Sequence, residues 1–153
     1  MVIAEAMLGF GEKAVDFFRM INPIEHSKTK DSVMKYKVEP YVIPADVYGQ
    51  GNLAGRGGWT WYTGSSSWMY IAGLKYILGL RIENGYMYFK PEVSNEWKEY
   101  SIKYKCGESI YNIKLKKCME NERKRVCLNG VECESNCIKL DNSGNVFEVE
   151  VEF

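Results

Sequence analysis

The sequence predicts an α+β protein in two consecutive parts, a helical part over residues 1–78 and an antiparallel β part over residues 79–153. Before residue 79, apolar residues recur at helical spacing, as in Ala14, Val15 and Phe18. After it, apolar and polar residues alternate, and glycine-containing turns follow at short intervals, which is typical of an antiparallel sandwich. A chain of 153 residues suffices for one ordinary domain or two small ones.

The helical part begins with a predicted helical hairpin. Gly9 and Gly11 separate a short helix over residues 3–8 from a second helix. The second helix is predicted to end at Asn22 and Pro23, because proline cannot continue a helix.

The rest of the helical part is predicted to be irregular up to one last helix. Residues 25–37 are polar and are predicted as loop. The two prolines within residues 38–48 permit only a short or interrupted helix there. Ser65 or Ser66 is predicted to cap the last helix, which stops at Gly79.

The β part is predicted as a series of hairpins. An Asn-Gly pair is the strongest short signal for a two-residue turn, and one lies at residues 129–130. Further turns are predicted at residues 83–85, around Gly107 and at 141–145. The predicted strands cover residues 80–82, 86–89, 101–104, 110–115, 126–128, 131–133, 138–140 and 146–153.

The charge pattern argues against a nucleic-acid-binding surface. The 20 basic and 20 acidic residues are evenly mixed, and the densest basic cluster, residues 123–125, is flanked by Glu120 and Glu122. No apolar run approaches the length of a membrane span, which is about 18 residues, and no secretory signal opens the sequence. We therefore expect a cytoplasmic chain with no membrane segment and no nucleic-acid partner.

The cysteines favour free thiols over disulfides. Their number is odd and all five lie in the β part, at positions 106, 118, 127, 133 and 137. Cys133 and Cys137 have the spacing of half a metal site, but no second pair and no nearby histidine completes it. Cys106 and Cys118 lack a histidine partner that could activate a nucleophile. Neither a metal nor a cofactor is predicted.

Residues 55–70 carry the strongest functional signal. The segment combines four glycines, several hydroxyl side chains and three of the four tryptophans, and it runs from a glycine loop into a helix. Free backbone N–H groups at such a junction favour an anion, and tryptophan faces suit the apolar faces of a sugar. A core corner of glycine and aromatic residues is the alternative. The candidate sugar-binding residues are Arg56, Trp59, Trp61 and Tyr62, whereas Trp68 and Tyr70 are predicted to be core residues.

Other ionisable residues are weaker candidates. Glu39 and Asp46 invite comparison with the carboxylate pair of a glycoside hydrolase, seven residues apart on a proline-bearing segment. Glu39 is more simply explained as part of the turn at Pro40. His26 is more simply explained as a loop or helix-end histidine than as a catalyst.

Several stretches, in order along the chain, carry a longer and more specific pattern. They are residues 18–26, 38–42, 45–48, 55–70, 76–81 and 91–97. Together they resemble the C-terminal end of glycoside hydrolase family 94, which holds cellobiose-type and β-1,2-glucan phosphorylases and the phosphorylase-like module of cyclic β-1,2-glucan synthases. The resemblance covers about residues 1–115, and the run over residues 55–64 is most similar to the cyclic-glucan-synthase branch.

The resemblance implies a fold and a reaction. Residues 1–78 would be the last helices of an (α/α)6 barrel, incomplete here, and residues 79–153 a C-terminal β-sandwich. In such enzymes inorganic phosphate attacks the anomeric carbon with inversion, while an aspartic acid protonates the leaving oxygen. The implied phosphate ligands are Thr63 and Gly64, and the implied partners are inorganic phosphate and a β-linked glucan or disaccharide.

The chain also departs from the family pattern. The catalytic aspartic acid and the phosphate-binding histidine and arginine lie upstream in family members, so no catalytic residue is assigned in this sequence, and His26 and Arg56 are not substitutes. We expect a C-terminal fragment that is inactive alone and that self-associates, as a possible homo-oligomer. The alternative is a non-catalytic carbohydrate-binding or structural β-sandwich module.

Overall fold

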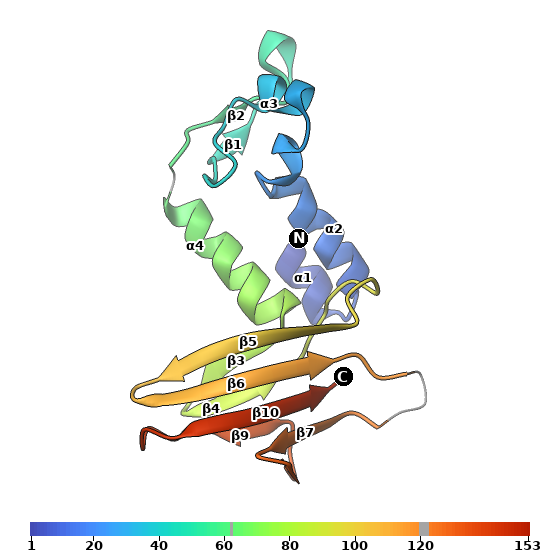
Figure 1. Cartoon of the computed structure of the whole chain (residues 1–153). Helices are drawn as coiled ribbons and strands as arrows, with labels where there is room; N and C mark the ends of the chain where they lie inside the picture. The colour runs from blue at the N-terminus through green and yellow to red at the C-terminus, as the bar shows by residue number, and fades with distance from the viewer. Residues whose placement is uncertain (62, 120–122) are drawn as a thin grey trace. The chain divides into compact units, whose positions relative to one another are not determined.

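The computed structural model describes residues 1–61, 63–119 and 123–153. The chain divides into two compact units, Met1–Gly73 and Leu74–Phe153, and each is described by itself (Figure 1). The first unit holds the helices and one small hairpin, and the second holds the larger sheets. The sequence thus belongs to the α+β class, as predicted.

The first unit opens with the predicted pair of helices. Helix α1 (Val2–Met7) and helix α2 (Gly11–Ile21) pack against each other, and Ala14 of α2 is completely buried. Gly9 has a φ of +83° in the connecting turn, a conformation that favours glycine. Helix α2 ends at Asn22 as expected, because Pro23 cannot extend it.

The prediction of a loop over residues 25–37 is wrong. The segment contains a 3-10 turn (Glu25–Ser27) and helix α3 (Lys30–Tyr36). Thr29 and Ser32 form a reciprocal capping box: the Ser32 backbone N–H donates to the Thr29 hydroxyl, and the Thr29 N–H donates to the Ser32 hydroxyl. The polar composition that suggested a loop is therefore the composition of a helix cap.

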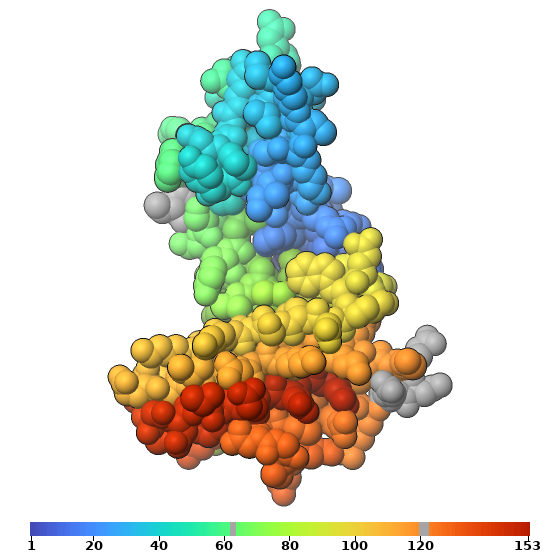
Figure 2. All heavy atoms as spheres, viewed as in Figure 1, coloured from blue at the N-terminus to red at the C-terminus, as the bar shows by residue number. Residues whose placement is uncertain are grey.

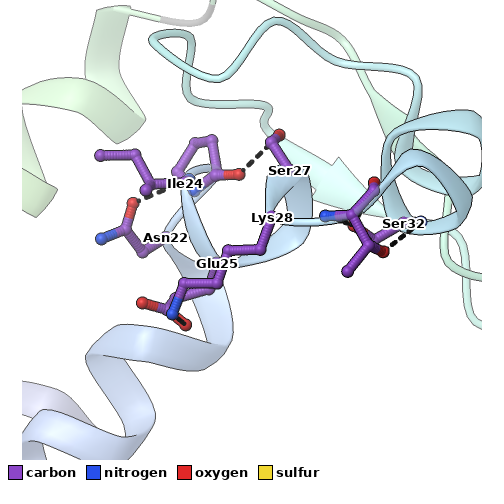
Figure 3. A network of polar contacts seen from close by, with 8 residues as sticks. Asn22, Ile24, Glu25, Ser27, Lys28 and Ser32 are labelled. Carbon is purple, nitrogen blue, oxygen red and sulfur yellow. Dashed lines mark hydrogen bonds and ion pairs between the residues drawn. The ribbon is translucent and has the colours of Figure 1, made fainter.

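Polar contacts also organise the chain before α3 (Figure 3). The Asn22 side chain accepts a hydrogen bond from the backbone N–H of Ile24, and the Ser27 hydroxyl donates to the carbonyl of Pro23. Lys28 pairs with Glu25 across one turn. These contacts satisfy the backbone where the chain turns from α2 toward α3.

The remaining elements of the first unit contain residues 55–70 or lie next to them in the chain. Strands β1 (Asp46–Val47) and β2 (Gly57–Gly58) form an antiparallel pair, and a 3-10 turn (Gly51–Leu53) lies in the loop between them. Helix α4 (Thr63–Ile71) follows and continues as a π-helical segment, η3 (Ala72–Ile77).

Two predictions for the last helix need correction. The helix begins at Thr63, so Ser65 and Ser66 lie within its first turn and neither caps it. Trp68 and Tyr70 are 64% and 69% exposed and are not core residues, because the described part of the chain leaves most of each side chain uncovered. Gly79 ends the helical segment as predicted, with a φ of +74°.

The second unit consists of two sheets. Strands β3 (Leu80–Glu83), β4 (Tyr86–Phe89) and β9 (Cys137–Lys139) form a sheet in the order β3-β4-β9. The larger sheet has the order β5-β6-β10-β7-β8. Its strands are β5 (Glu99–Cys106), β6 (Ser109–Lys116), β7 (Arg125–Leu128), β8 (Val131–Glu132) and β10 (Val146–Glu152). In Figure 2, β5, β6 and β10 lie side by side on the visible face of this unit.

The larger sheet is mixed, which corrects the prediction of a purely antiparallel one. Strand β10 runs parallel to β6, with Val149 opposite Ile113, and antiparallel to β7. Parallel neighbours need a long crossover connection. Here that connection contains β7, β8 and β9, so the chain re-enters the sheet beside β6 in the same direction.

The hairpin turns are confirmed. Asn84 and Gly85 both have positive φ values between β3 and β4, and so do Asn129 and Gly130 between β7 and β8. Gly107 lies in the turn between β5 and β6, with a φ of +56°.

Both sheets contribute to one hydrophobic core. Met87 and Ile138 come from the smaller sheet, and Tyr111, Leu115 and Val149 from the larger one. The outward residues of the larger sheet alternate in charge across neighbouring strands, as where Glu99 pairs with Lys116 of β6 and Lys116 with Glu152 of β10. The alternation of burial along β5 and β6 is that of a sheet with one face in the core and one in water.

Candidate functional site

The β1–β2 hairpin positions the glycine-tryptophan segment. A Cβ on Gly57 would lie 2.3 Å from Cγ2 of Val38, and one on Gly58 would lie 2.3 Å from Oδ1 of Asp46. The absence of a side chain at Gly57 therefore permits the close approach of β2 to the buried Val38, whereas the Asp46 carboxylate could rotate away from a Cβ on Gly58. Packing therefore explains part of the glycine content of residues 55–70, in agreement with the alternative interpretation of this segment as a core corner.

The first cavity of interest, which we call the Gly64 cavity, lies beside the start of α4. Its volume is 740 Å³, and ligand pockets usually measure about 300 to 1,000 Å³. Asp46 is the charged residue in its wall, and Gly64 and Ser65 contribute the start of the helix. The remaining lining is mostly apolar and comprises Met1, Val2, Ile3, Ile21, Ile43, Pro44, Ala45, Val47, Trp68, Met69 and Ala72.

The start of α4 offers backbone donors to this cavity. Thr63, Gly64 and Ser65 are the first three residues of the helix, and the N–H groups of a first turn have no acceptor within the helix. The partial positive charge at a helix N-terminus adds to their attraction for an anion. Gly64 and Ser65 line the cavity, so an anion there would lie within reach of these groups.

A second cavity, which we call the aromatic cavity, lies on the other part of the hairpin and has a volume of 810 Å³. Two of the predicted sugar-binding residues, Arg56 and Trp59, line it. The other lining residues are Val33, Lys37, Val38, Glu39, Pro40, Tyr48, Leu53, Gly57, Gly58 and Thr60. The wall of this cavity therefore contains cationic, anionic, hydroxyl and aromatic side chains.

Trp59 and Trp61 have an unusual backbone. Their φ angles are +49° and +62°, in the left-handed region that bulky residues rarely adopt. Such a conformation costs on the order of 1–3 kcal/mol at each position. The two side chains are 78% and 65% exposed, so burial of the rings does not offset this cost. The ring of Trp61 lies edge-on to that of Tyr41, with 6.2 Å between the ring centroids.

The structure divides the predicted site residues between two places. Gly64 lines one cavity, Arg56 and Trp59 line the other, and the two cavities have no lining residue in common. Trp61 is in the wall of neither and pairs with Tyr41. Thr63 is placed as the first residue of α4, and Tyr62 lies outside the described residues.

Sequence reasoning missed two tyrosines, one in the cavity wall with Trp59 and one in ring contact with Trp61. Tyr48 lines the aromatic cavity with Trp59, and Tyr41 contacts Trp61. Both tyrosines lie in stretches that carry the family resemblance, residues 38–42 and 45–48, and this was the signal that could have indicated them.

The two candidate carboxylates and the histidine lie in different parts of the first unit. Glu39 lines the aromatic cavity and Asp46 the Gly64 cavity, so they do not form one carboxylate pair. His26 Nε2 lies 2.7 Å from the carbonyl oxygen of Met20, and its ring stacks on Tyr36 at a centroid distance of 4.7 Å. Burial raises the pKa of the Tyr36 hydroxyl.

The cysteines and the helices add no further site. Among the described residues, none of the five cysteines forms a disulfide. Among residues 1–61, 63–119 and 123–153, no cluster of histidine, cysteine or acidic side chains is suited to hold a metal ion. None of the helices in these same ranges has the length and apolar character required to cross a bilayer.

The comparison with protein families identifies the class. Residues 1–79 match the family model described as the glycosyl hydrolase 94 superfamily, catalytic domain. This match covers more than half of the chain, and the chain belongs to this superfamily, as the sequence resemblance predicted.

Individual relatives carry the comparison further. The chain is 43% identical over 114 residues to the cyclic β-(1,2)-glucan synthase NdvB of Rhizobium meliloti, covering 74% of this chain and 4% of that protein. It is 26% identical over 160 residues to the solabiose phosphorylase of Paenibacillus borealis, covering 99% and 20%. It is 28% identical over 114 residues to the N,N'-diacetylchitobiose phosphorylase of Vibrio proteolyticus, covering 74% and 14%. The chain thus spans a fifth or less of the length of these relatives.

Proposed function

We propose that this chain is the C-terminal part of an inverting phosphorylase or a cyclic β-1,2-glucan synthase-like enzyme, and that it supplies one wall of the active site. In this proposal the phosphate lies at the start of α4, against Thr63 and Gly64. The sugar lies against Arg56, Trp59, Trp61 and Tyr62. The catalytic aspartic acid belongs to another segment of the complete enzyme, so the chain alone is inactive.

One observation carries the proposal: Gly64 and Ser65, at the amino end of α4, line a cavity that is large enough for a ligand. Backbone N–H groups there would donate to phosphate oxygens, and charge-assisted hydrogen bonds are the strong ones. They would also stabilise negative charge that shifts on the phosphate during attack at the anomeric carbon. The names of the relatives supply the substrate classes, a β-1,2-linked glucan and disaccharides cleaved by phosphate.

A substitution in the complete enzyme tests the phosphate site. Thr63→Val removes a hydroxyl donor at nearly constant volume, and a hydrogen bond to a charged group contributes about 1.5–3 kcal/mol. We expect the KM for phosphate to rise about 10- to 100-fold. Ser66→Ala on the same helix is the matched control, because Ser66 follows the first three residues of α4 and no phosphate contact is proposed for it. An unchanged phosphate KM in Thr63→Val, or an equal rise in the control, would contradict the proposed site.

The isolated chain tests the second half of the proposal. Incubated with phosphate and β-1,2-, β-1,3- or β-1,4-linked gluco-oligosaccharides, it should release no glucose 1-phosphate, since it lacks the general acid. Release by the purified chain, at a rate that follows its concentration, would show that the catalytic machinery is complete in these residues and would overturn the assignment as one wall of a site.

A further inference from the structure

The proposed function makes no use of the cysteines, and three of them come from adjoining segments of the second unit. Cys127 lies in β7, Cys133 directly follows β8, and Cys137 is the first residue of β9. All three side chains are half-buried. Cys133 and Cys137 have the spacing of half a metal site, but the part of the chain that the structure describes contains no group of ligands that completes one. Two thiols four residues apart can instead react with each other.

Electrostatic interaction indicates that the three thiols form one cluster. Burial raises the pKa of the Cys133 thiol, and negative charge on Cys127 or Cys137 raises it further. Charges that are more than about 10 Å apart are largely screened from each other at ordinary salt concentration. Cys127 and Cys137 therefore both lie near Cys133, and Cys133 is the member of the cluster for which a bonding partner must be chosen.

Strand geometry argues against a bond between Cys127 and Cys133. Cys127 lies opposite Glu132 in the β7–β8 hairpin. The backbone N–H of Cys133 donates to the Val126 carbonyl at 2.8 Å, and Cys133 packs against the hydrophobic core that contains Val126. Neighbouring residues of a strand point to opposite faces, so the Cys127 side chain leaves the sheet on the face away from Val126. A bond between Cys127 and Cys133 would therefore require the hairpin to open.

The short segment between Cys133 and Cys137 is better suited to a bond. Residues 134–136 are exposed, and the chain bends at each of them. Cys137 lies at the end of the β4–β9 ladder, opposite Tyr88, and strand ends open at little cost in free energy. A disulfide needs Cα atoms about 4.4–6.8 Å apart. Movement of this short loop can bring the two cysteines to that separation while the β7–β8 hairpin and the rest of β9 stay in place.

A serine distinguishes the two thiols chemically. Ser135 Oγ lies 3.2 Å from Cys137 Sγ, so the hydroxyl can donate to this sulfur and stabilise its thiolate, which is the nucleophilic form. Cys133 packs against the core, where burial favours the neutral thiol. A nucleophilic thiolate beside a second thiol is the arrangement in which the first sulfur is oxidised and the second then forms the disulfide.

We propose that Cys133 and Cys137 are an oxidation-sensitive pair, which hydrogen peroxide converts from two thiols into a disulfide. This pair lies in the second unit, and the inference is independent of the proposed sugar and phosphate sites. The chain with free thiols is then the reduced form of the protein.

The reaction has two steps. The Cys137 thiolate attacks one peroxide oxygen and the O–O bond breaks, so that Cys137 becomes a sulfenic acid and the released hydroxide takes up a proton to form water. The Cys133 sulfur then attacks the Cys137 sulfur. The S–S bond forms as the S–O bond breaks, and the hydroxyl leaves with the Cys133 proton as a second water molecule. The two sulfurs together lose two electrons, and the peroxide gains them.

Peptide mapping of the purified chain tests the proposal. The chain is treated with hydrogen peroxide without denaturant, the remaining thiols are alkylated, and the chain is digested with trypsin and a protease that cleaves after glutamate. Cleavage after Glu132 and Glu134 separates all three cysteines, so only a disulfide holds two of the peptides together. We expect mass spectrometry to find residues 133–134 joined to residues 135–139, and dithiothreitol to release them. A link from Cys133 to Cys127, or a treated chain in which Cys133 and Cys137 are both alkylated, would overturn the proposal.

Variants test the roles of the individual residues. Cys127→Ser should leave the link and its rate of formation unchanged, and Cys137→Ser should abolish the link. Ser135→Ala should slow its formation about 3- to 10-fold, because the Cys137 thiolate loses a hydrogen-bond donor. Ser101→Ala, at an exposed position of β5, is the matched control and should leave the rate unchanged. Equal rates in Ser135→Ala and the control would show that Ser135 does not activate Cys137, and loss of the link in Cys127→Ser would reject the assigned pair.

Discussion

Trp61 shows how a single residue can be held in a conformation that its side chain disfavours. Its φ is +62° and its ring is largely exposed, so the backbone cost is not recovered by burial. At an ordinary position glycine is less stable than alanine, because glycine loses more conformational freedom on folding. At a left-handed position the order reverses, since the Cβ of alanine is the source of the strain.

We therefore predict that Trp61→Gly is more stable than Trp61→Ala by about 1 kcal/mol, the left-handed penalty of about 1–2 kcal/mol less the entropic cost of glycine. Urea denaturation of the two variants measures the difference in the free energy of unfolding. Both lack the ring, so the comparison between them isolates the effect of the backbone. A more stable alanine variant would mean that the backbone at residue 61 is not left-handed in solution.

At the scale of elements, Gly79 connects the helical segment to β3. Its φ is +74°, and a Cβ there would lie 2.2 Å from the carbonyl carbon of Lys90. The backbone N–H of Lys90 donates to the Gly79 carbonyl at 2.9 Å, so the two segments approach with no room for a side chain. Gly79 therefore has two roles: it ends the helical segment, and its lack of a side chain permits the close approach to Lys90.

Gly79→Ala should destabilise the chain by about 3 kcal/mol, which combines the left-handed penalty with the cost of a clash against backbone. Gly85→Ala is the matched control, since Gly85 has a φ of +77° but no atom within 4 Å of a Cβ. It should cost only about 1–2 kcal/mol. Chemical denaturation of both variants gives the difference, and equal losses would mean that the close approach to Lys90 does not exist.

At the scale of the whole molecule, the two units differ in how completely they bury their apolar residues. The second unit closes a core between its two sheets. The first unit has a small buried cluster of Tyr36, Val38 and Val42 and many exposed apolar side chains. Those more than half exposed are Met1, Met7, Leu8, Phe10, Met20, Ile24, Met34, Tyr41, Trp59, Trp61, Trp68 and Tyr70. Such exposure marks surfaces that other protein or ligand covers.

We expect the full chain to self-associate and residues 74–153 alone to fold as a cooperative monomer. Sedimentation of both species over a range of concentrations, with thermal melting of the shorter one, measures this. The apolar surface of residues 1–73 is the physical reason, because its burial between copies removes it from water. A full chain that stays monomeric, or a shorter chain that aggregates, would contradict the prediction that the apolar surface of residues 1–73 causes self-association.

The sequence by itself determined the features that depend on neighbouring residues. Asn84-Gly85 and Asn129-Gly130 specify their turns locally, because their backbones adopt positive φ at little cost. Pro23 ends α2 through a different local effect, because its ring and missing N–H cannot continue a helix. The family was also readable, since it rests on the order of residues along the chain.

The tertiary structure alone decided what depends on residues far apart. The parallel pairing of β10 with β6 follows from the path of the chain between them, and no local pattern encodes that path. The division of residues 55–64 between two cavities depends on the segments that line each cavity, residues 1–3, 21 and 43–47 in one and 33–40 and 48 in the other. Such contacts join segments that are far apart in the sequence, and the local sequence of each segment does not determine which other segment it will contact.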